Sequence, residues 1–249
     1  MHLAGAFAEL GMSVLLVDMD PQGSLSQGFL GSEMVESLPS LQTTATLFDE
    51  NSFFASHDAL LIPTPFERIT LCPANQTLAR FNAPEPEKTG MVQFALREFL
   101  ADQHEFDIVL IDCPPNLYRC SWTAMIAADY AMIPVPPEDF GTQGLRAVHQ
   151  CVRQARKLNP KLSRIEHLIT RCDHRLLVHR MYEQKLRALY GKTVLDTIIP
   201  EASAFKVALT RRRPVQLHQP RSKAAKLTLS LAREILERIS MDECKRKVA

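Results

Sequence analysis

An apolar run that stops abruptly at alternating carboxylates constrains the fold of this chain most. The run is Val14–Val17, and Asp18, Asp20 and Pro21 follow it. A short continuous apolar segment is typical of a buried parallel strand, and open α/β sheets carry their chemistry where such strands end. Asp18 and Asp20 lie two positions apart, so their side chains share one face of an extended strand and could converge on a metal or its bound water. A polar strand end followed by an Asp-Pro turn explains the same residues without a ligand.

A second apolar strand ends in the same way. The run Phe106–Ile111 is followed by Asp112 and then by Pro114 and Pro115. An acid that ends a hydrophobic strand is the Walker-B arrangement, which holds magnesium beside nucleotide phosphates. Two such strands in one chain favour a ligand site over two unrelated polar turns.

The order of apolar and amphipathic segments predicts the fold class. We expect strands near residues 13–18, 68–72, 106–112, 130–135, 165–170 and 194–199, and helices over 90–102, 143–158, 178–190 and 222–239. Strands that alternate with helices of this length predict an α/β fold with a mostly parallel, doubly wound sheet flanked by helices. At 249 residues, with 46% hydrophobic and 23% charged residues, the chain suits one globular domain spanning 1–249.

At this point the chain resembles the ParA/MinD family of deviant P-loop ATPases, and the ParA branch most closely. The segments that carry the resemblance follow the family's order: 2–20, 74–79, 159–162, 170–175, 199–202 and 213–215. Residues 31–66 match no part of the family pattern, so we expect a variable insertion or loop there. The resemblance implies the P-loop NTPase fold.

The family's first strand and phosphate loop are missing from this sequence. That loop has the pattern Lys-Gly-Gly-x-Gly-Lys-Thr, and its backbone amides cradle phosphates. Gly191-Lys192-Thr193 does not replace it, because Leu186 stands where a P-loop needs a glycine and a helix is expected before it. We expect an ATPase domain that is N-terminally incomplete and inactive as this chain alone. A degenerate member that has lost nucleotide binding is the alternative.

The resemblance also implies roles for individual residues toward ATP and Mg²⁺. Asp20 would position or activate the attacking water, Asp18 would support the magnesium shell and the switch region, and Asp112 would hold magnesium through water. The residues implied near the base are Thr170, Asp173, Arg175, Pro200 and Glu201. A capped helix start explains the Thr-x-x-Asp-x-Arg pattern equally well. The chain departs from the family's usual small residues and asparagine at Asn116, Tyr118, Arg119 and Thr123, which affects the expected switch and partner contacts.

Positive charge is concentrated in the C-terminal segment 206–249. The net charge is only +1, yet this segment holds twelve Lys/Arg and four Asp/Glu. Such a segment can bind phosphate backbones without reading sequence, which the resemblance implies for ParA-type ATPases. The candidate DNA-binding residues are Lys206, Arg211, Arg212, Arg213, Arg221 and Lys223. A solvated helix face is the alternative, and it is the preferred explanation for 233–238, where signs are mixed.

The remaining sequence features concern the cellular location of the protein and the possibility of a zinc site. The sequence has no apolar run of transmembrane length and no signal-peptide pattern, so we expect a cytoplasmic protein without membrane contact. The resemblance to ParA-type ATPases implies that the protein is nucleoid-associated. Six cysteines show no zinc-ligand spacing. The leading hypothesis is a partition ATPase that forms an ATP-dependent homodimer, binds non-specific DNA and is stimulated by a ParB-like adaptor or cargo protein. The alternatives are a nucleotide-free scaffold and a related ATPase that positions a cargo other than DNA.

Overall fold

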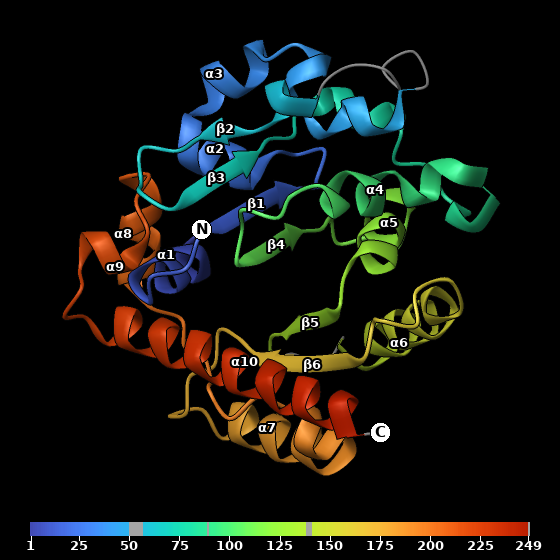
Figure 1. Ribbon diagram of the computed structural model, residues 1–249. Helices are drawn as coiled ribbons and strands as arrows, with labels where there is room; N and C mark the ends of the chain where they lie inside the picture. The colour runs from blue at the N-terminus through green and yellow to red at the C-terminus, as the bar shows by residue number, and fades with distance from the viewer. Residues whose placement is uncertain (50–56, 89, 138–140, 249) are drawn as a thin grey trace.

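The computed structural model describes residues 1–49, 57–88, 90–137 and 141–248 (Figure 1). One sheet has the strand order β2-β3-β1-β4, formed by β2 (Ile62–Pro63), β3 (Ile69–Cys72), β1 (Val14–Asp18) and β4 (Ile108–Asp112). β1 runs parallel to β3 and β4, and only β2 is antiparallel. A second sheet pairs β5 (Tyr130–Val135) with β6 (Arg164–Ile169) in parallel. The predicted α/β class with a mostly parallel sheet is confirmed.

Helices cover both faces of the first sheet. In β1, Leu15 and Val17 pack toward α4 (Ala95–Ala101) and α5 (Arg119–Ala127). Val14 and Leu16 pack on the opposite face toward α1 (His2–Glu9), α2 (Ser24–Leu30) and α10 (Lys223–Val248). This alternation follows from the two-residue period of a strand, and it explains why β1 is apolar at every position but its last.

The other helices complete the two layers. The remaining bounds are α3 (Ser32–Ser37), α6 (Gly141–Leu158), α7 (Leu177–Tyr190), α8 (Ser203–Thr210) and α9 (Val215–His218). Around the second sheet, Ile169 packs with residues of α6 and α7, whereas Leu168 packs with Leu231 of α10. The predicted helix over 90–102 instead begins as a 3-10 helix, Gly90–Phe94, before α4. In the part of the chain that the structure describes, every helix is too short or too polar to cross a bilayer.

β4 and β5 each pair with one strand only, so the two sheets are separate. All five residues of β1, which has two partners, are buried, whereas no residue of β4 is fully buried. The predicted absence of a first strand from the sheet stays a prediction, and these two edges are where such a strand would pair.

The predicted strand over 194–199 is wrong. The segment makes two isolated parallel bridges, at Val194 and Ile199, to the neighbourhood of β6. Between them, the backbone N–H groups of Asp196 and Thr197 donate to the Glu234 carboxylate over 2.7 and 2.9 Å. The Glu234 side chain of α10 therefore accepts from two amides that would donate to a neighbouring strand in a sheet.

Residues of the predicted insertion, 31–66, pack into the domain. Ala45, Phe48 and Leu60 join the core around β1, and the Thr44 amide donates to Pro73 O over 2.8 Å. The segment contains α3, β2 and short 3-10 helices at Ser40–Gln42, Thr44–Phe48 and His57–Leu60. In its described part the segment is therefore a covering layer of the sheet.

Two stacked histidines lie between α6 and β6. Thr193 Oγ1 donates to Tyr190 O, so it accepts from His167 Nδ1–H over 3.0 Å. His167 Nε2 is then unprotonated and accepts from His149 Nε2–H over 3.0 Å. Burial first, and His149 second, lower the pKa of His167 to about 4. The pair is neutral at pH 7.

We predict that acid weakens the fold through His167. The unfolded chain takes up a proton near pH 6.5, whereas the folded protein resists it until about pH 4. The free energy of unfolding should therefore fall by about 2 kcal/mol between pH 7 and pH 5 through this residue. Urea unfolding of the wild type and of His167→Asn at both pH values measures the effect. Equal pH dependence in the two proteins would contradict it.

Candidate active site at the ends of β1 and β4

The carboxylates predicted from two separate strands meet at one sheet edge. In the parallel ladder of β1 and β4, Asp18 lies directly opposite Asp112. The Met19 amide donates to Asp112 O over 2.8 Å, which continues the pairing one residue past β1. Asp20 follows immediately, and its charge raises the pKa of Asp112. The structure therefore brings Asp18, Asp20 and Asp112 together.

Asp18 is fully buried and ties β1 to α2. Its Oδ2 accepts from the Ser26 amide over 2.9 Å and from Ser26 Oγ over 2.6 Å, and its Oδ1 accepts from the Asp20 amide over 3.1 Å. Burial raises the pKa of Asp18 to about 7, although these hydrogen bonds oppose the rise. Asp18 thus shapes the loop that carries Asp20, in keeping with its predicted supporting role.

Asp112 and Asp20 are the accessible carboxylates of the group. The Asp112 side chain is exposed at the end of β4, yet the protein around it removes enough water to raise the pKa of its carboxyl. The buried amino group of Met1, at the start of α1, acts in the opposite direction. Asp20 is half-buried, and its Oδ1 accepts from the Gln22 amide over 3.0 Å. Both carboxylates keep oxygen atoms free of the contacts that occupy Asp18.

The loop after Asp20 depends on a glycine. Gly23 has a φ of 60°, and a Cβ there would lie 2.5 Å from the backbone oxygen of Ala74. Ser26 Oγ also accepts from the Ala74 amide over 2.9 Å, so the loop is held against the end of β3. Sequence reasoning did not single out Gly23 or Ser26. The order Asp20-Pro21-Gln22-Gly23 is typical of a type I turn and could have marked the glycine, whereas no local pattern marks Ser26.

We predict that Gly23→Ala destabilises the protein much more than Gly11→Ala. Both glycines have positive φ values, 60° and 88°, but a Cβ at Gly11 would meet nothing within 4 Å. The left-handed backbone alone costs about 1 kcal/mol, and the clash with Ala74 O adds about 2 kcal/mol at Gly23. Denaturant unfolding of the two variants isolates the clash. Equal losses of stability would show that the loop is not held as described.

The carboxylates fit magnesium only together with a phosphate ligand. In the described ranges, no three His, Cys, Asp or Glu side chains converge to hold a metal by themselves. Magnesium usually keeps several waters and binds one or two carboxylates plus substrate phosphates, and Asp20 and Asp112 suit that arrangement. The sequence supplies no phosphate cradle for it: Gly191–Thr193 forms a 3-10 turn directly after α7, as expected of a sequence that is not a P-loop.

The residues predicted near the base come together at the end of β6. Thr170 bridges to Ile199, which places Pro200 and Glu201 beside the segment that follows β6. Arg175 donates to both oxygens of Asp173, with a shortest distance of 2.7 Å, and this pairing lowers the pKa of Asp173 to about 2. Asp173 does not cap α7, whose N-cap Leu176 has no side-chain cap, so the capped-helix explanation is wrong. A role for these residues toward a base stays a prediction.

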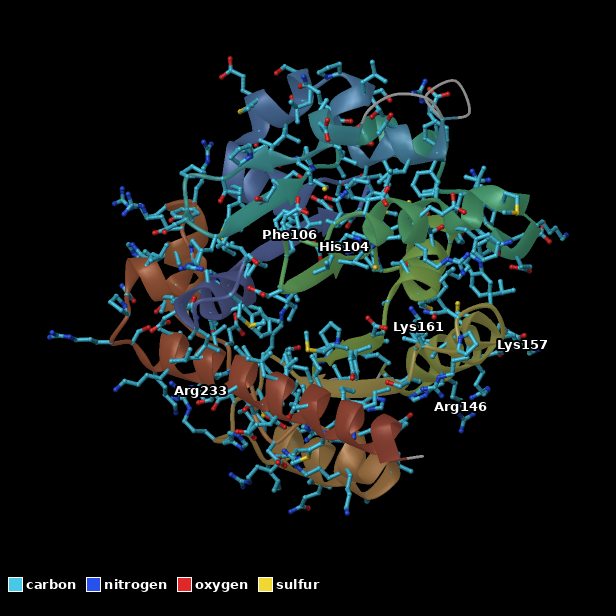
Figure 2. All side chains as sticks on the ribbon, in the orientation of Figure 1. His104, Phe106, Arg146, Lys157, Lys161 and Arg233 are labelled. Carbon is cyan, nitrogen blue, oxygen red and sulfur yellow. The ribbon has the colours of Figure 1, made fainter. Side chains whose placement is uncertain are left out.

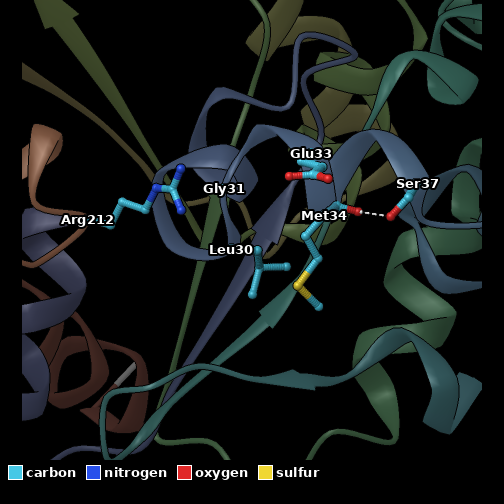
Figure 3. A pocket seen from close by; sticks show the side chains of 6 residues that line it. All are labelled: Leu30, Gly31, Glu33, Met34, Ser37 and Arg212. Atoms are coloured by element: carbon cyan, nitrogen blue, oxygen red, sulfur yellow. Dashed lines mark hydrogen bonds between the residues drawn. The ribbon is translucent and has the colours of Figure 1, made fainter.

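The candidate DNA-binding residues lie in α8, in the turns on either side of α9 and at the start of α10. Lys206 is paired with Glu201 over 2.6 Å, and this ion pair, together with Arg171, lowers the pKa of Glu201. The exposed triplet Arg211–Arg213 joins α8 to α9. Arg212 reaches across to Gly31 and lines a hollow of about 450 Å³ with Glu33 and Met34 (Figure 3). Arg221 and Lys223 are exposed near the first turn of α10.

Comparisons with known proteins agree with this architecture. The sequence family described as "AAA domain" matches residues 1–164. The chain is 31% identical to "Chromosome-partitioning ATPase Soj" of Thermus thermophilus, covering 96% of this chain and 89% of that protein. It is 28% identical to "Chromosome partitioning protein ParA" of Myxococcus xanthus, over 100% of this chain and 86% of that protein.

A solved structure shares the fold and holds a nucleotide. It is the cobyrinic acid a,c-diamide synthase of Mycobacterium smegmatis with bound ATP analog and magnesium, at 26% identity and a TM-score of 0.77, covering 96% of this chain and 88% of that one. Sequence identity to the partition ATPases and the match to the "AAA domain" family extend over most of the chain. The chain belongs to the ParA/MinD family of P-loop ATPases.

Proposed function

We propose that this protein is a ParA-type partition ATPase that works with ATP and Mg²⁺. The observation that carries the proposal is the pairing of Asp18 with Asp112 across β1 and β4, with Asp20 on the loop that follows. The relatives named for chromosome partitioning support it. ATP hydrolysis then times the release of DNA.

We assign each of the three carboxylates a different role, according to its exposure. Asp112, exposed at the end of β4, would hold magnesium, and half-buried Asp20 would orient the attacking water. Buried Asp18 keeps the Asp20 loop in place through Ser26. Bound magnesium supplies positive charge against the phosphates, which is the main requirement of phosphoryl transfer. Thr170, Asp173, Arg175, Pro200 and Glu201 form the side of the site that receives the base.

The proposed activity needs a phosphate-binding loop, and these 249 residues contain none. A chain that works without such a loop would be the nucleotide-free scaffold, and the missing pattern is the observation that favours this second candidate.

The proposed partners follow from charge and from the relatives. ATP drives homodimer formation, and the dimer binds non-specific DNA through Lys206, Arg211, Arg212, Arg213, Arg221 and Lys223. A ParB-like adaptor or cargo protein stimulates hydrolysis, and the protein acts in the cytoplasm at the nucleoid. A cargo other than DNA remains the alternative within the same enzyme class.

Sedimentation of the protein made from its natural gene tests this proposal. We expect a monomer with ADP and a dimer with ATP and Mg²⁺, and we expect only the dimer to sediment with duplex DNA. A dimer that forms with ATP but ignores DNA would support the alternative cargo. A sedimentation coefficient that nucleotides leave unchanged would support the scaffold.

A further inference from the structure

The segment that contains α6 is strongly cationic. Residues 140–165 include no Asp or Glu, and their six Lys/Arg are Arg146, Arg153, Arg156, Lys157, Lys161 and Arg164. The proposed function gives the charge of this segment no role.

Three of these cations form a row on the outer face of α6. Arg146, Arg153 and Lys157 are exposed, and their spacing of seven and then four residues keeps them on one side of a helix. The opposite side of α6 is fixed in the core through Leu145 and Val152. Arg146 and Lys157 lie at the outer side of α6 in Figure 2. A rigid helix therefore presents a line of positive charge to solvent.

Among the described residues, the fold holds Arg156 and Arg164, whereas the three cations of the row form no ion pair. Arg156 donates to Leu162 O and Ser163 O over 2.8 and 2.9 Å, and Arg164 pairs with Glu166 over 3.1 Å. Within the described residues, no carboxylate forms an ion pair with Arg146, Arg153 or Lys157. Their charges therefore form no ion pair that stabilises the described part of the fold.

The positive charge of α6 also affects the pKa of a neighbouring histidine. Burial first, and then the charges of Arg153 and Arg156, lower the pKa of His149, one turn from Arg146. Burial first, and then the charge of Glu87, raises the pKa of Cys151 on the same helix.

We propose that the row of Arg146, Arg153 and Lys157 on α6 binds the phosphate backbone of duplex DNA. The row is about 16 Å long at 1.5 Å per residue, so its three cations can contact successive phosphates of a DNA strand. A membrane surface is a poorer ligand, because the apolar side chains of α6 that would enter it are packed in the core. The chain also carries Gln150 and Gln154 between the cations, which are donors for phosphate oxygens.

This surface is distinct from the candidate DNA-binding residues between 206 and 223. In Figure 1, the turn between α8 and α9 lies at the far side of the molecule from α6. Arg233 of α10 is likewise well separated from Arg146 and Lys157 in Figure 2. Two separate cationic surfaces would let one protein contact two DNA segments, and the α6 row needs no nucleotide to form.

The test is DNA binding by a triple variant with Arg146→Gln, Arg153→Gln and Lys157→Gln. The probe is a fluorescent duplex of mixed sequence, titrated without nucleotide at several sodium chloride concentrations. We expect affinity to fall at least about tenfold, and the slope of log affinity against log salt to become shallower by about 3. A variant with Arg146→Lys and Arg153→Lys should keep the wild-type affinity, because each phosphate contact keeps its charge.

The matched control removes the same charge elsewhere. It carries Arg80→Gln, Arg180→Gln and Lys185→Gln, three exposed cations outside both surfaces. Unfolding curves should be unchanged in the α6 variant, since its three side chains form no ion pair within the described residues. If DNA affinity fell equally in the α6 and control variants, net charge alone would explain the loss, and the proposal would be overturned. Unchanged DNA affinity in the α6 variant, or loss only of binding to phosphatidylglycerol vesicles, would also overturn it.

The outcome is independent of the proposed function. A variant of the Arg211–Arg213 triplet, measured alone and combined with the α6 changes, separates the two surfaces. If the α6 variant alone loses DNA binding, the row is established as a DNA-binding surface, even when the triplet variant binds DNA like the wild type.

Discussion

Replacing Asp20 with alanine in the protein made from its natural gene should leave ATP binding intact and reduce stimulated turnover by about 100-fold or more. Asp20 is the half-buried carboxylate on the loop between β1 and α2, and its Oδ1 accepts only from Gln22 within its own turn. Its loss removes the group that orients water without disturbing the buried bonds of Asp18. Steady-state phosphate release with saturating DNA and adaptor measures turnover, and filter binding of labelled ATP measures affinity.

The control for this experiment is Asp102→Ala. Asp102 ends α4 and is exposed, so its removal changes the net charge equally without touching the sheet edge. We expect wild-type turnover in the control. Unchanged turnover in Asp20→Ala would remove the role assigned to this residue.

Reversing the charge of Arg211, Arg212 and Arg213 to glutamate should weaken DNA binding by about 100-fold or more at 0.1 M salt. The triplet is exposed in the turn between α8 and α9, where three charges change sign and the net charge of one short segment falls by six units. The remaining binding should depend less on salt, because fewer counterions are released. Reversal of Arg80, Arg97 and Arg180 is the matched control. A triplet variant that binds DNA no worse than this control would contradict the assignment.

The fold was predictable where local sequence patterns coincide with tertiary packing. β1 and β4 are apolar runs that end in acids, and each was expected from the chain alone. The strand expected over 194–199 failed because Glu234, some forty residues later, accepts the amides that a ladder would use. No local pattern contains that information.

In the candidate site, too, long-range contacts could not be predicted from local sequence patterns. The pairing of Asp18 with Asp112 followed from their positions at strand ends, but the contacts of Asp18 with Ser26 depend on how α2 folds back. The segment 31–66 gave no signal, since its anchors are long-range, such as the bonds from Asn75 Nδ2 to Val35 O and Leu38 O. The charge of α6 was visible in the sequence, yet only the burial of its apolar face showed that the cations form a row.

Equilibrium binding of ATP to the protein made from its natural gene tests the central claim most directly. The account predicts saturable binding with Mg²⁺ that is lost when EDTA removes the metal and is weakened by Asp112→Asn. A folded protein that binds no ATP with or without Mg²⁺ would contradict it, and the carboxylates at the ends of β1 and β4 would then belong to a scaffold.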